Sequence, residues 1–193
     1  MNKMYSFAYT ILWPIVHILW PYRYTGRAAI PEGAAVVCAN HSSFIDPILV
    51  ALAFGRKHFL HFMAKAELFK VPVLNWVMRK AGAYGVNRGA NDISAVRTSM
   101  KFLKAGEKIL IFPEGTRVSE DDAVEARNGA IRLASKLRVP IVPVHVPRRK
   151  KLFSRVYINI GQPYYIENAD HSNFDSHSNE LMQRIRDLQG ENK

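Results

Sequence analysis

The sequence contains a single cysteine, Cys38, among its 193 residues. One thiol cannot form an internal disulfide, and it cannot provide the several ligands of a structural zinc site. Because Cys38 lies in the apolar run 34–39, we expect it to be a small core residue rather than a nucleophile. The chain also lacks a Walker loop, a dinucleotide-binding glycine fingerprint and a cluster of histidines and cysteines. The sequence therefore predicts no bound cofactor and no metal ion.

Charged side chains are missing from residues 4–22, which contain no aspartate, glutamate, lysine or arginine but include two tryptophans. A helix that spans a bilayer needs about 20 apolar residues, and Pro14 interrupts this run. Tryptophan and tyrosine prefer the membrane interface, and Arg23 and Arg27 would hold the rest of the chain on the cytoplasmic side. We predict that residues 1–26 form an apolar, membrane-associating helical segment and that residues 27–193 form the folded domain. The alternatives are a helix packed on the domain's own core and a cleaved signal.

Acidic residues are scarce: there are 16 of them against 27 lysines and arginines, and the net charge is +11. Such a balance favours an anionic partner, for example a membrane surface, a phosphorylated substrate, an acidic carrier protein or a nucleic acid. A nucleic-acid reader should interleave basic and exposed aromatic residues, whereas the aromatics here concentrate in apolar runs, which favours lipid. The basic run 148–151 (RRKK) is predicted to attract anionic lipid, with a solvated loop as the alternative.

Apolar runs and helical patterns alternate after Arg23, which predicts an α/β fold with a largely parallel central sheet flanked by helices. The length suits one domain with a substantial core. In such sheets ligands bind beyond the carboxyl ends of the strands, so loops that follow strands are the expected site. We expect strands at 34–39, 58–63, 84–86, 108–112, 141–146 and 155–160, and helices at 44–54, 68–80, 91–105, 129–137 and 178–189.

His41 and Asp46 come after the first of these strands, in the segment 40–47 (NHSSFIDP). An imidazole can take up a proton near neutral pH, and a carboxylate can fix its tautomer and stabilise its charged form. The two side chains can meet if His41 ends a loop and Asp46 lies in the first turn of the next helix. Of the seven histidines, only His41 has an aspartate at this His-x4-Asp spacing. The pair predicts a general base and its orienting group; the alternative is that both only cap the next helix.

Three further blocks lie later in the chain, at 82–88 (GAYGVNR), 112–117 (FPEGTR) and 139–144 (VPIVPV). In this order and spacing the four blocks resemble the glycerolipid acyltransferases, most closely the lysophosphatidic acid acyltransferase (1-acylglycerol-3-phosphate acyltransferase) family. The resemblance covers roughly residues 35–146, so it implies that 27–193 is an acyltransferase domain. It also implies a membrane-associated enzyme, whose active site Arg23 and Arg27 would place on the cytoplasmic side.

The resemblance implies acyl transfer from a thioester to the sn-2 hydroxyl of lysophosphatidate, which gives phosphatidate for phospholipid synthesis. The donor would be acyl-coenzyme A or acyl carrier protein, acting as a substrate. His41 would be the base and Asp46 its orienting group, and no acyl-enzyme is needed because a thioester already has a good leaving group.

The substrate phosphate is expected to bind Arg117 and Arg88, since a guanidinium can bind phosphate oxygens through two parallel donors. Lys65 occupies a position that the resemblance also links to the phosphate. Gly115 would let the backbone pass close to the ligand, and Glu114 would orient Arg117 or accept a hydrogen bond from a glycerol hydroxyl. Thr116 lies in the same turn and completes the predicted binding block.

Other functions are compatible with parts of the pattern. Ser42 and Ser43 raise the alternative of a serine hydrolase, but adjacent residues seldom place a hydroxyl on a neighbouring imidazole, and the chain has no Gly-x-Ser-x-Gly elbow. Both serines are therefore assigned to the start of the next helix. The remaining alternatives are an acyltransferase for glycerol 3-phosphate or another lysolipid, and a non-enzymatic basic protein that binds membranes or nucleic acid.

Overall fold

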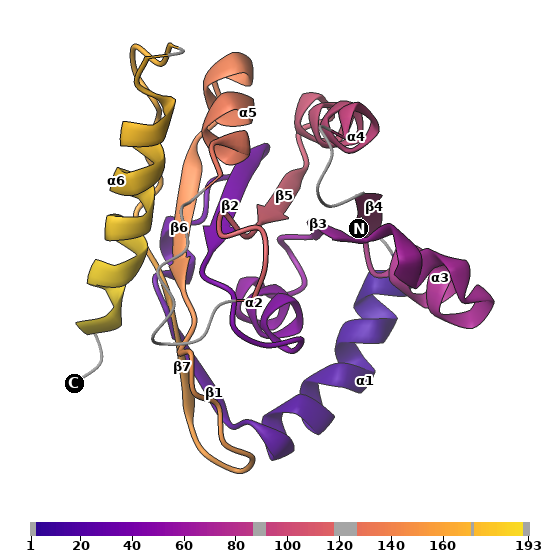
Figure 1. The fold of residues 1–193 in the computed structure, drawn as a ribbon. Coiled ribbons are helices and arrows are strands. Elements are labelled where there is room, and N and C mark those ends of the chain that lie inside the picture. The colour runs from indigo at the N-terminus through magenta and orange to yellow at the C-terminus, as the bar shows by residue number, and fades with distance from the viewer. Residues whose placement is uncertain (1–2, 87–91, 118–126, 171, 191–193) are drawn as a thin grey trace.

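The computed structural model describes residues 3–86, 92–117, 127–170 and 172–190, and within them a seven-stranded sheet lies between two layers of helices (Figure 1). The strand order is β1-β7-β6-β2-β5-β3-β4. The strands are β1 (Tyr22–Thr25), β2 (Ala35–Ala39), β3 (Leu60–Lys65), β4 (Ala83–Val86), β5 (Lys108–Ile111), β6 (Ile141–His145) and β7 (Val156–Ile160). The helices are α1 (Lys3–Leu19), α2 (Asp46–Phe54), α3 (Pro72–Lys80), α4 (Ile93–Lys104), α5 (Gly129–Leu137) and α6 (Phe174–Asp187), with 3-10 turns η1 (Arg27–Ala29), η2 (Ala66–Lys70) and η3 (Leu188–Gly190).

Neighbouring strands from β6 to β4 are parallel, while β7 runs antiparallel to β6 and parallel to β1. The prediction of a largely parallel α/β sheet is therefore confirmed. Because β6, β2, β5, β3 and β4 point the same way, their carboxyl ends meet at one edge of the sheet. The loops after β2 and β5 and the last residue of β3 carry side chains that the sequence singles out for the site.

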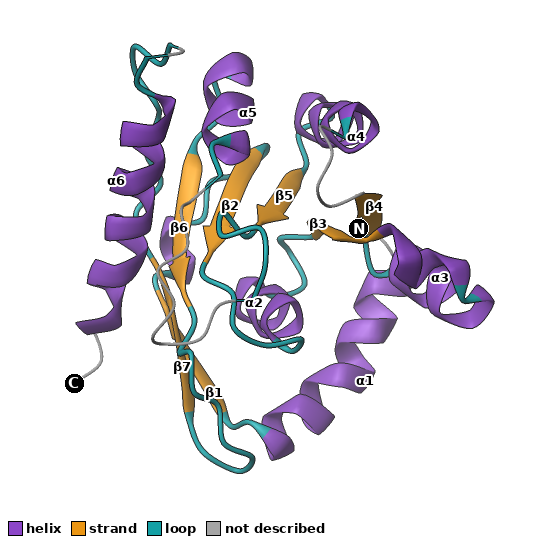
Figure 2. Cartoon of the chain, viewed as in Figure 1, coloured by secondary structure: helices purple, strands orange, loops and turns teal. Residues whose placement is uncertain are grey.

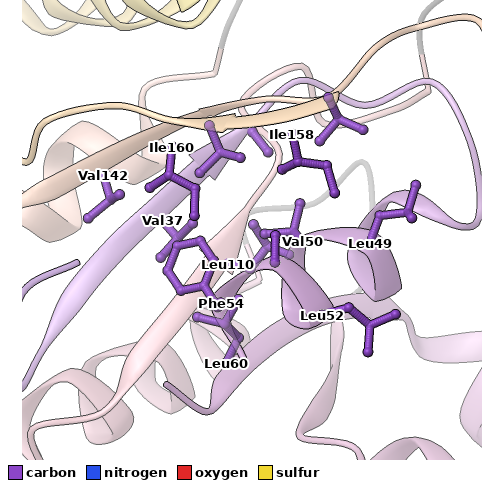
Figure 3. Close-up of a cluster of buried hydrophobic side chains, with 14 of the residues drawn as sticks. Val37, Leu49, Val50, Leu52, Phe54, Leu60, Leu110, Val142, Ile158 and Ile160 are labelled. Carbon is purple, nitrogen blue, oxygen red and sulfur yellow. The ribbon is translucent and has the colours of Figure 1, made fainter. Parts of the chain in front are cut away.

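Helices cover both faces of the sheet, so successive side chains of a central strand are all buried (Figure 2). In β2, Val37 packs in the layer that contains α2, and Figure 3 shows it with Phe54, Leu110 and Ile158. Its neighbours Val36 and Cys38 point to the opposite layer, where α5 and α6 pack. Cys38 is fully buried there, in agreement with its predicted place in the core.

The N-terminal segment forms helix α1, which packs along α2 through its tyrosines. The hydroxyl of Tyr9 donates to the Leu52 carbonyl at 3.3 Å, and that of Tyr5 to the Ala51 carbonyl at 3.4 Å. The helix has a second apolar face that is exposed, with side chains Phe7, Ile11, Ile15 and Ile18. Within the described residues, no helix combines the length and the apolar character that crossing a bilayer requires.

Strand β1 was not expected from the sequence, because it begins at Tyr22, the last residue of the uncharged run 4–22. It pairs with β7 from Tyr22 opposite Val156 to Thr25 opposite Asn159, so the end of the N-terminal segment belongs to the sheet. Arg27 then closes helix α2, since its guanidinium donates to the carbonyls of Ala53 at 2.6 Å and Leu52 at 3.0 Å. Cations are favourable at this end of a helix.

Candidate active site

The predicted site residues lie where parallel strands end. His41 comes two residues after β2, Lys65 is the last residue of β3, and the turn 112–117 comes after β5. Since β2 lies between β5 and β6, the loops after all three strands share one rim. The arrangement brings together residues from three distant parts of the sequence.

His41 and Asp46 meet as the sequence predicts. The Nδ1 atom of His41 lies 3.0 Å from Oδ2 of Asp46, and both side chains are buried. Asp46 stands in the first turn of α2, and its Oδ2 also accepts the backbone N–H groups of Ser42 and Ser43, each at 2.7 Å. The loop between β2 and α2 thus folds around the carboxylate of Asp46, which is the first residue of α2.

The protonation of the pair is set by these contacts. Burial by itself raises the pKa of Asp46, but the hydrogen bond from His41 and the nearby ammonium group of Lys150 hold it below its ordinary value. An ionised carboxylate can only accept hydrogen bonds, so Nδ1 of His41 carries the proton and Nε2 is the basic nitrogen. The imidazole ring stacks on Phe112, with ring centroids 4.1 Å apart, and lines a large cavity.

Glu114 is buried and supports the loop rather than Arg117. Its Oε2 accepts the backbone N–H of His41 at 2.7 Å, and its Oε1 accepts from the guanidinium of Arg148 at 2.8 Å. Burial raises the pKa of Glu114, while these two donors oppose the rise. With both carboxylate oxygens in use, the side chain joins the turn after β5 to the loop after β2.

After Glu114, the turn continues with Gly115 and then with two exposed residues, Thr116 and Arg117. Gly115 adopts a left-handed backbone with φ of 68°, which favours glycine, and a Cβ there would lie 2.7 Å from Nε of Arg127, so the arginine side chain would have to shift. Thr116 and Arg117 are exposed, and the Arg117 guanidinium lies 3.6 Å from the ring centroid of Phe44. This stacking holds Arg117 beside the loop that carries His41.

Lys65 is exposed at the same edge of the sheet but does not line the cavity with His41. Arg88 lies outside the described residues. Arg127, which the sequence did not single out, lines the cavity and lies against Gly115. Its position is fixed by a hydrogen bond between its backbone N–H and the Pro113 carbonyl at 2.8 Å, which no local pattern indicates.

The cavity has a volume of about 1130 Å³ and is lined by residues of α4 and α5 and by His41. Much of its wall is apolar and comes from β3, β4, α4, β5 and α5: Met63, Val86, Ile93, Val96, Met100, Ile111 and Leu133. Basic side chains Arg127, Arg132 and Lys136 also line it. The cavity can hold an apolar chain and an anionic group at the same time.

The loop after β6 contains two site residues that were assigned to a lipid-binding basic run. Arg148 reaches Glu114, and the Lys150 ammonium lies 2.9 Å from Oδ1 of Asp46, with 3% of its side chain exposed. The run 148–151 is therefore not a row of surface charges, because these two side chains point into the site. Sequence spacing carried no signal for this, since the loop after β6 lies far from Asp46 along the chain.

Ser42 is engaged away from His41. Its hydroxyl donates to the Arg148 carbonyl at 3.0 Å and accepts from Lys150 at 2.9 Å. The serine therefore ties the two loops together. This geometry gives no support to a serine nucleophile activated by His41.

Comparisons with known proteins agree with the arrangement. Residues 22–147 match the family model described as Acyltransferase. The chain is 31% identical to the 1-acyl-sn-glycerol-3-phosphate acyltransferase of Bacillus subtilis, over 96% of this chain and 97% of the relative. It is 32% identical to the enzyme of the same name from Streptococcus pneumoniae, over 82% and 63%.

A solved structure has the same fold. The 1-acyl-sn-glycerophosphate acyltransferase PlsC from Thermotoga maritima superposes with a TM-score of 0.69 and 25% identity, over all of this chain and 79% of that one. The matches span the sheet, the His41 loop and the turn after β5. The chain thus belongs to the acyltransferase family, in the 1-acyl-sn-glycerol-3-phosphate acyltransferase group.

Proposed function

We propose that this protein transfers a fatty acyl group from an acyl thioester to the sn-2 hydroxyl of lysophosphatidate and releases phosphatidate and a free thiol. The observation that carries the proposal is the His41–Asp46 pair, whose histidine lines a large, mostly apolar cavity. The names of the relatives support the acceptor. The proposed donor is an acyl group on coenzyme A or on acyl carrier protein.

The proposed reaction needs one base. Nε2 of His41 takes the proton of the sn-2 hydroxyl as its oxygen forms a bond to the thioester carbonyl carbon. The C–S bond then breaks, and the imidazolium returns the proton to the departing thiolate sulfur. Asp46 keeps Nδ1 protonated throughout and stabilises the imidazolium, so the ring never has to turn.

The acyl donor is assigned to the cavity between α4 and α5. Its apolar wall suits a fatty chain, because burying a methylene group contributes about 0.8 kcal/mol. Arg127, Arg132 and Lys136 would then bind the phosphate of the pantetheine arm. Coenzyme A and acyl carrier protein share this phosphate and thioester.

The phosphate of the acceptor is assigned to Arg117. Its guanidinium is exposed and is fixed over Phe44, in the loop that carries His41 and Asp46. A guanidinium offers paired donors that match phosphate oxygens. Arg88, from its guanidinium, and Lys65, from the family resemblance, stay predicted contributors.

Membrane association is assigned to the exposed apolar face of α1 together with the tip of the β6–β7 loop. Leu152 and Phe153 are 57% and 69% exposed, and the Phe153 N–H donates to the Leu19 carbonyl at 2.6 Å, which brings the tip to the end of α1. A helix with such a face lies in the plane of the membrane interface, with the apolar side chains buried among the lipids. The cytoplasmic side remains a prediction from Arg23 and Arg27, although the Arg27 guanidinium is engaged with α2.

The direct test is an assay of thiol release with palmitoyl-coenzyme A and lysophosphatidate in detergent micelles, with phosphatidate identified as the product. Native protein should release thiol only when the acceptor is present, and His41→Ala should abolish the reaction while keeping the folded spectrum. Glycerol 3-phosphate and lysophosphatidylcholine serve as competing acceptors. If the enzyme prefers either of them, that compound is the acceptor and not lysophosphatidate. If His41→Ala keeps near-native turnover, the proposed mechanism is wrong.

A further inference from the structure

We infer that Lys150 is a positioning residue of the His41–Asp46 pair, a buried cation that fixes the carboxylate on which the base depends. The inference rests on the proposed function, since it concerns the same base. Neither the family match nor the names of the relatives assign this residue. It comes from the geometry of the loop after β6.

The two oxygens of Asp46 have separate partners. Oδ2 faces His41 and the backbone N–H groups of Ser42 and Ser43, whereas Oδ1 faces the ammonium group of Lys150 at 2.9 Å. The carboxylate is completely buried, and Lys150 is its described partner at Oδ1. A buried carboxylate that loses its ion partner is strongly destabilised, so Lys150 keeps this one ionised.

The ammonium group is held in a fixed place by oxygen acceptors from both loops. Lys150 donates to the Ser42 hydroxyl at 2.9 Å and to the carbonyls of Pro147 and Arg148. The Ser42 hydroxyl in turn donates to the Arg148 carbonyl. A flexible lysine with all its donors occupied acts as a rigid group, and it cannot at the same time bind a lipid headgroup.

The charges around the pair determine what the loss of Lys150 should do. The titratable and charged groups described near it are Asp46, His41, Glu114, Arg148 and His145. Glu114 and Arg148 balance each other in an ion pair, so Lys150 is the cation that offsets Asp46. Removing it should make protonation of the His41–Asp46 pair easier, because one opposing positive charge is lost. The pair should then become inactive at a higher pH than in the native enzyme.

The experiment compares Lys150→Met with the native enzyme and with Lys104→Met, an exposed lysine at the end of α4. Thiol release is measured across the acid and neutral pH range in micelles with saturating lysophosphatidate and palmitoyl-coenzyme A. Lys150→Met should lower kcat about 10²-fold, as expected for a slightly misplaced catalytic group, with KM for both substrates within about twofold. The acid limb of kcat should move up by about one pH unit. Lys104→Met should match the native enzyme.

Two more variants keep the outcome decisive. Lys150→Arg retains the charge and should restore the native acid limb, with kcat closer to native than in Lys150→Met. Lys150→Gln provides a second neutral side chain if the methionine variant does not fold, and it should show the same upward shift. A folded neutral variant whose acid limb stays in place would overturn the inference, even if kcat falls, because a purely structural role would leave the limb unmoved. His41→Ala is tested separately, and its activity decides the proposed function alone.

Discussion

A carboxylate oxygen of Glu114 accepts the backbone N–H of His41 at 2.7 Å, so the turn after β5 holds the main chain of the His41 loop after β2. The other oxygen of the same carboxylate binds Arg148. One buried side chain therefore connects three loops that come after three neighbouring strands. It fixes the backbone of His41, the proposed base, through a contact to its N–H group.

Glu114→Gln should consequently reduce both stability and turnover. The amide keeps the shape of the side chain, but its NH2 group must face one of two donors, so one hydrogen bond is lost. A hydrogen bond to a charged group contributes about 1.5–3 kcal/mol, and we expect a loss of stability in that range. Urea unfolding and kcat measure the two effects, and the exposed Glu167→Gln serves as the control. An unchanged unfolding midpoint would contradict the role given to Glu114.

Asp46→Asn should reduce kcat by about 10⁴-fold, as in serine proteases where an amide replaces the carboxylate that orients the histidine. The amide can hold the wrong imidazole tautomer and cannot stabilise the imidazolium. KM for both substrates should change little, since Asp46 is buried behind His41. Steady-state kinetics with the folded variant decide this. A variant that keeps about a tenth of native turnover would rule out the orienting role.

Arg117→Ala should raise KM for lysophosphatidate more than KM for the acyl donor, because a phosphate contact that persists in the transition state is lost. A charged contact of this kind is worth about 1.5–3 kcal/mol, or roughly 10- to 100-fold in kcat/KM. Monoacylglycerol, which has no phosphate, is the informative acceptor. An equal loss with that substrate would assign Arg117 to another task.

Val96→Trp should restrict the cavity between α4 and α5. Val96 lines the cavity and is 45% exposed on α4, so the helix can carry a larger side chain without a core clash. We expect kcat/KM to fall for palmitoyl donors and to change little for short-chain donors. A uniform loss across chain lengths would place the acyl chain elsewhere.

Paired substitution of Phe7 and Ile18 by serine should weaken binding to liposomes while thiol release in micelles and thermal stability stay native. Among the described side chains of α1, these are the most exposed large apolar ones, at 62% and 67%. Deleting residues 1–22 is a poorer test, because Tyr5, Val16 and Tyr22 are buried against the domain. Co-sedimentation with phosphatidylglycerol vesicles gives the measurement. Native sedimentation of the double variant would exclude this face as the main anchor.

Elements with a strong local pattern were predicted well from the sequence. The buried strand β2, the helix α5 and the His41–Asp46 contact all depend on residues close together in the chain. Helix α6 begins at Phe174 rather than at the expected residue 178, so Ser178 lies inside the helix, where its hydroxyl donates back to the Phe174 carbonyl.

Features set by distant partners were not predictable in this way. Strand β1 exists because β7, near the other end of the chain, offers it an edge to pair with. Lys150 and Arg148 read as members of a surface basic run, and only the position of the loop after β6 turns them toward Asp46 and Glu114. In both cases the structure depends on contacts between residues far apart in the sequence, and the local composition does not indicate such contacts.

The position of Cys38 has a practical consequence for the chemistry of the assay. Burial in β2 raises the pKa of this thiol and shields it completely from solvent, so a thiol-trapping reagent such as a disulfide dye should leave the folded enzyme untouched. The dye would then count released coenzyme A without a background from the catalyst. In denaturant, the same dye would label one site per chain and report the unfolded fraction.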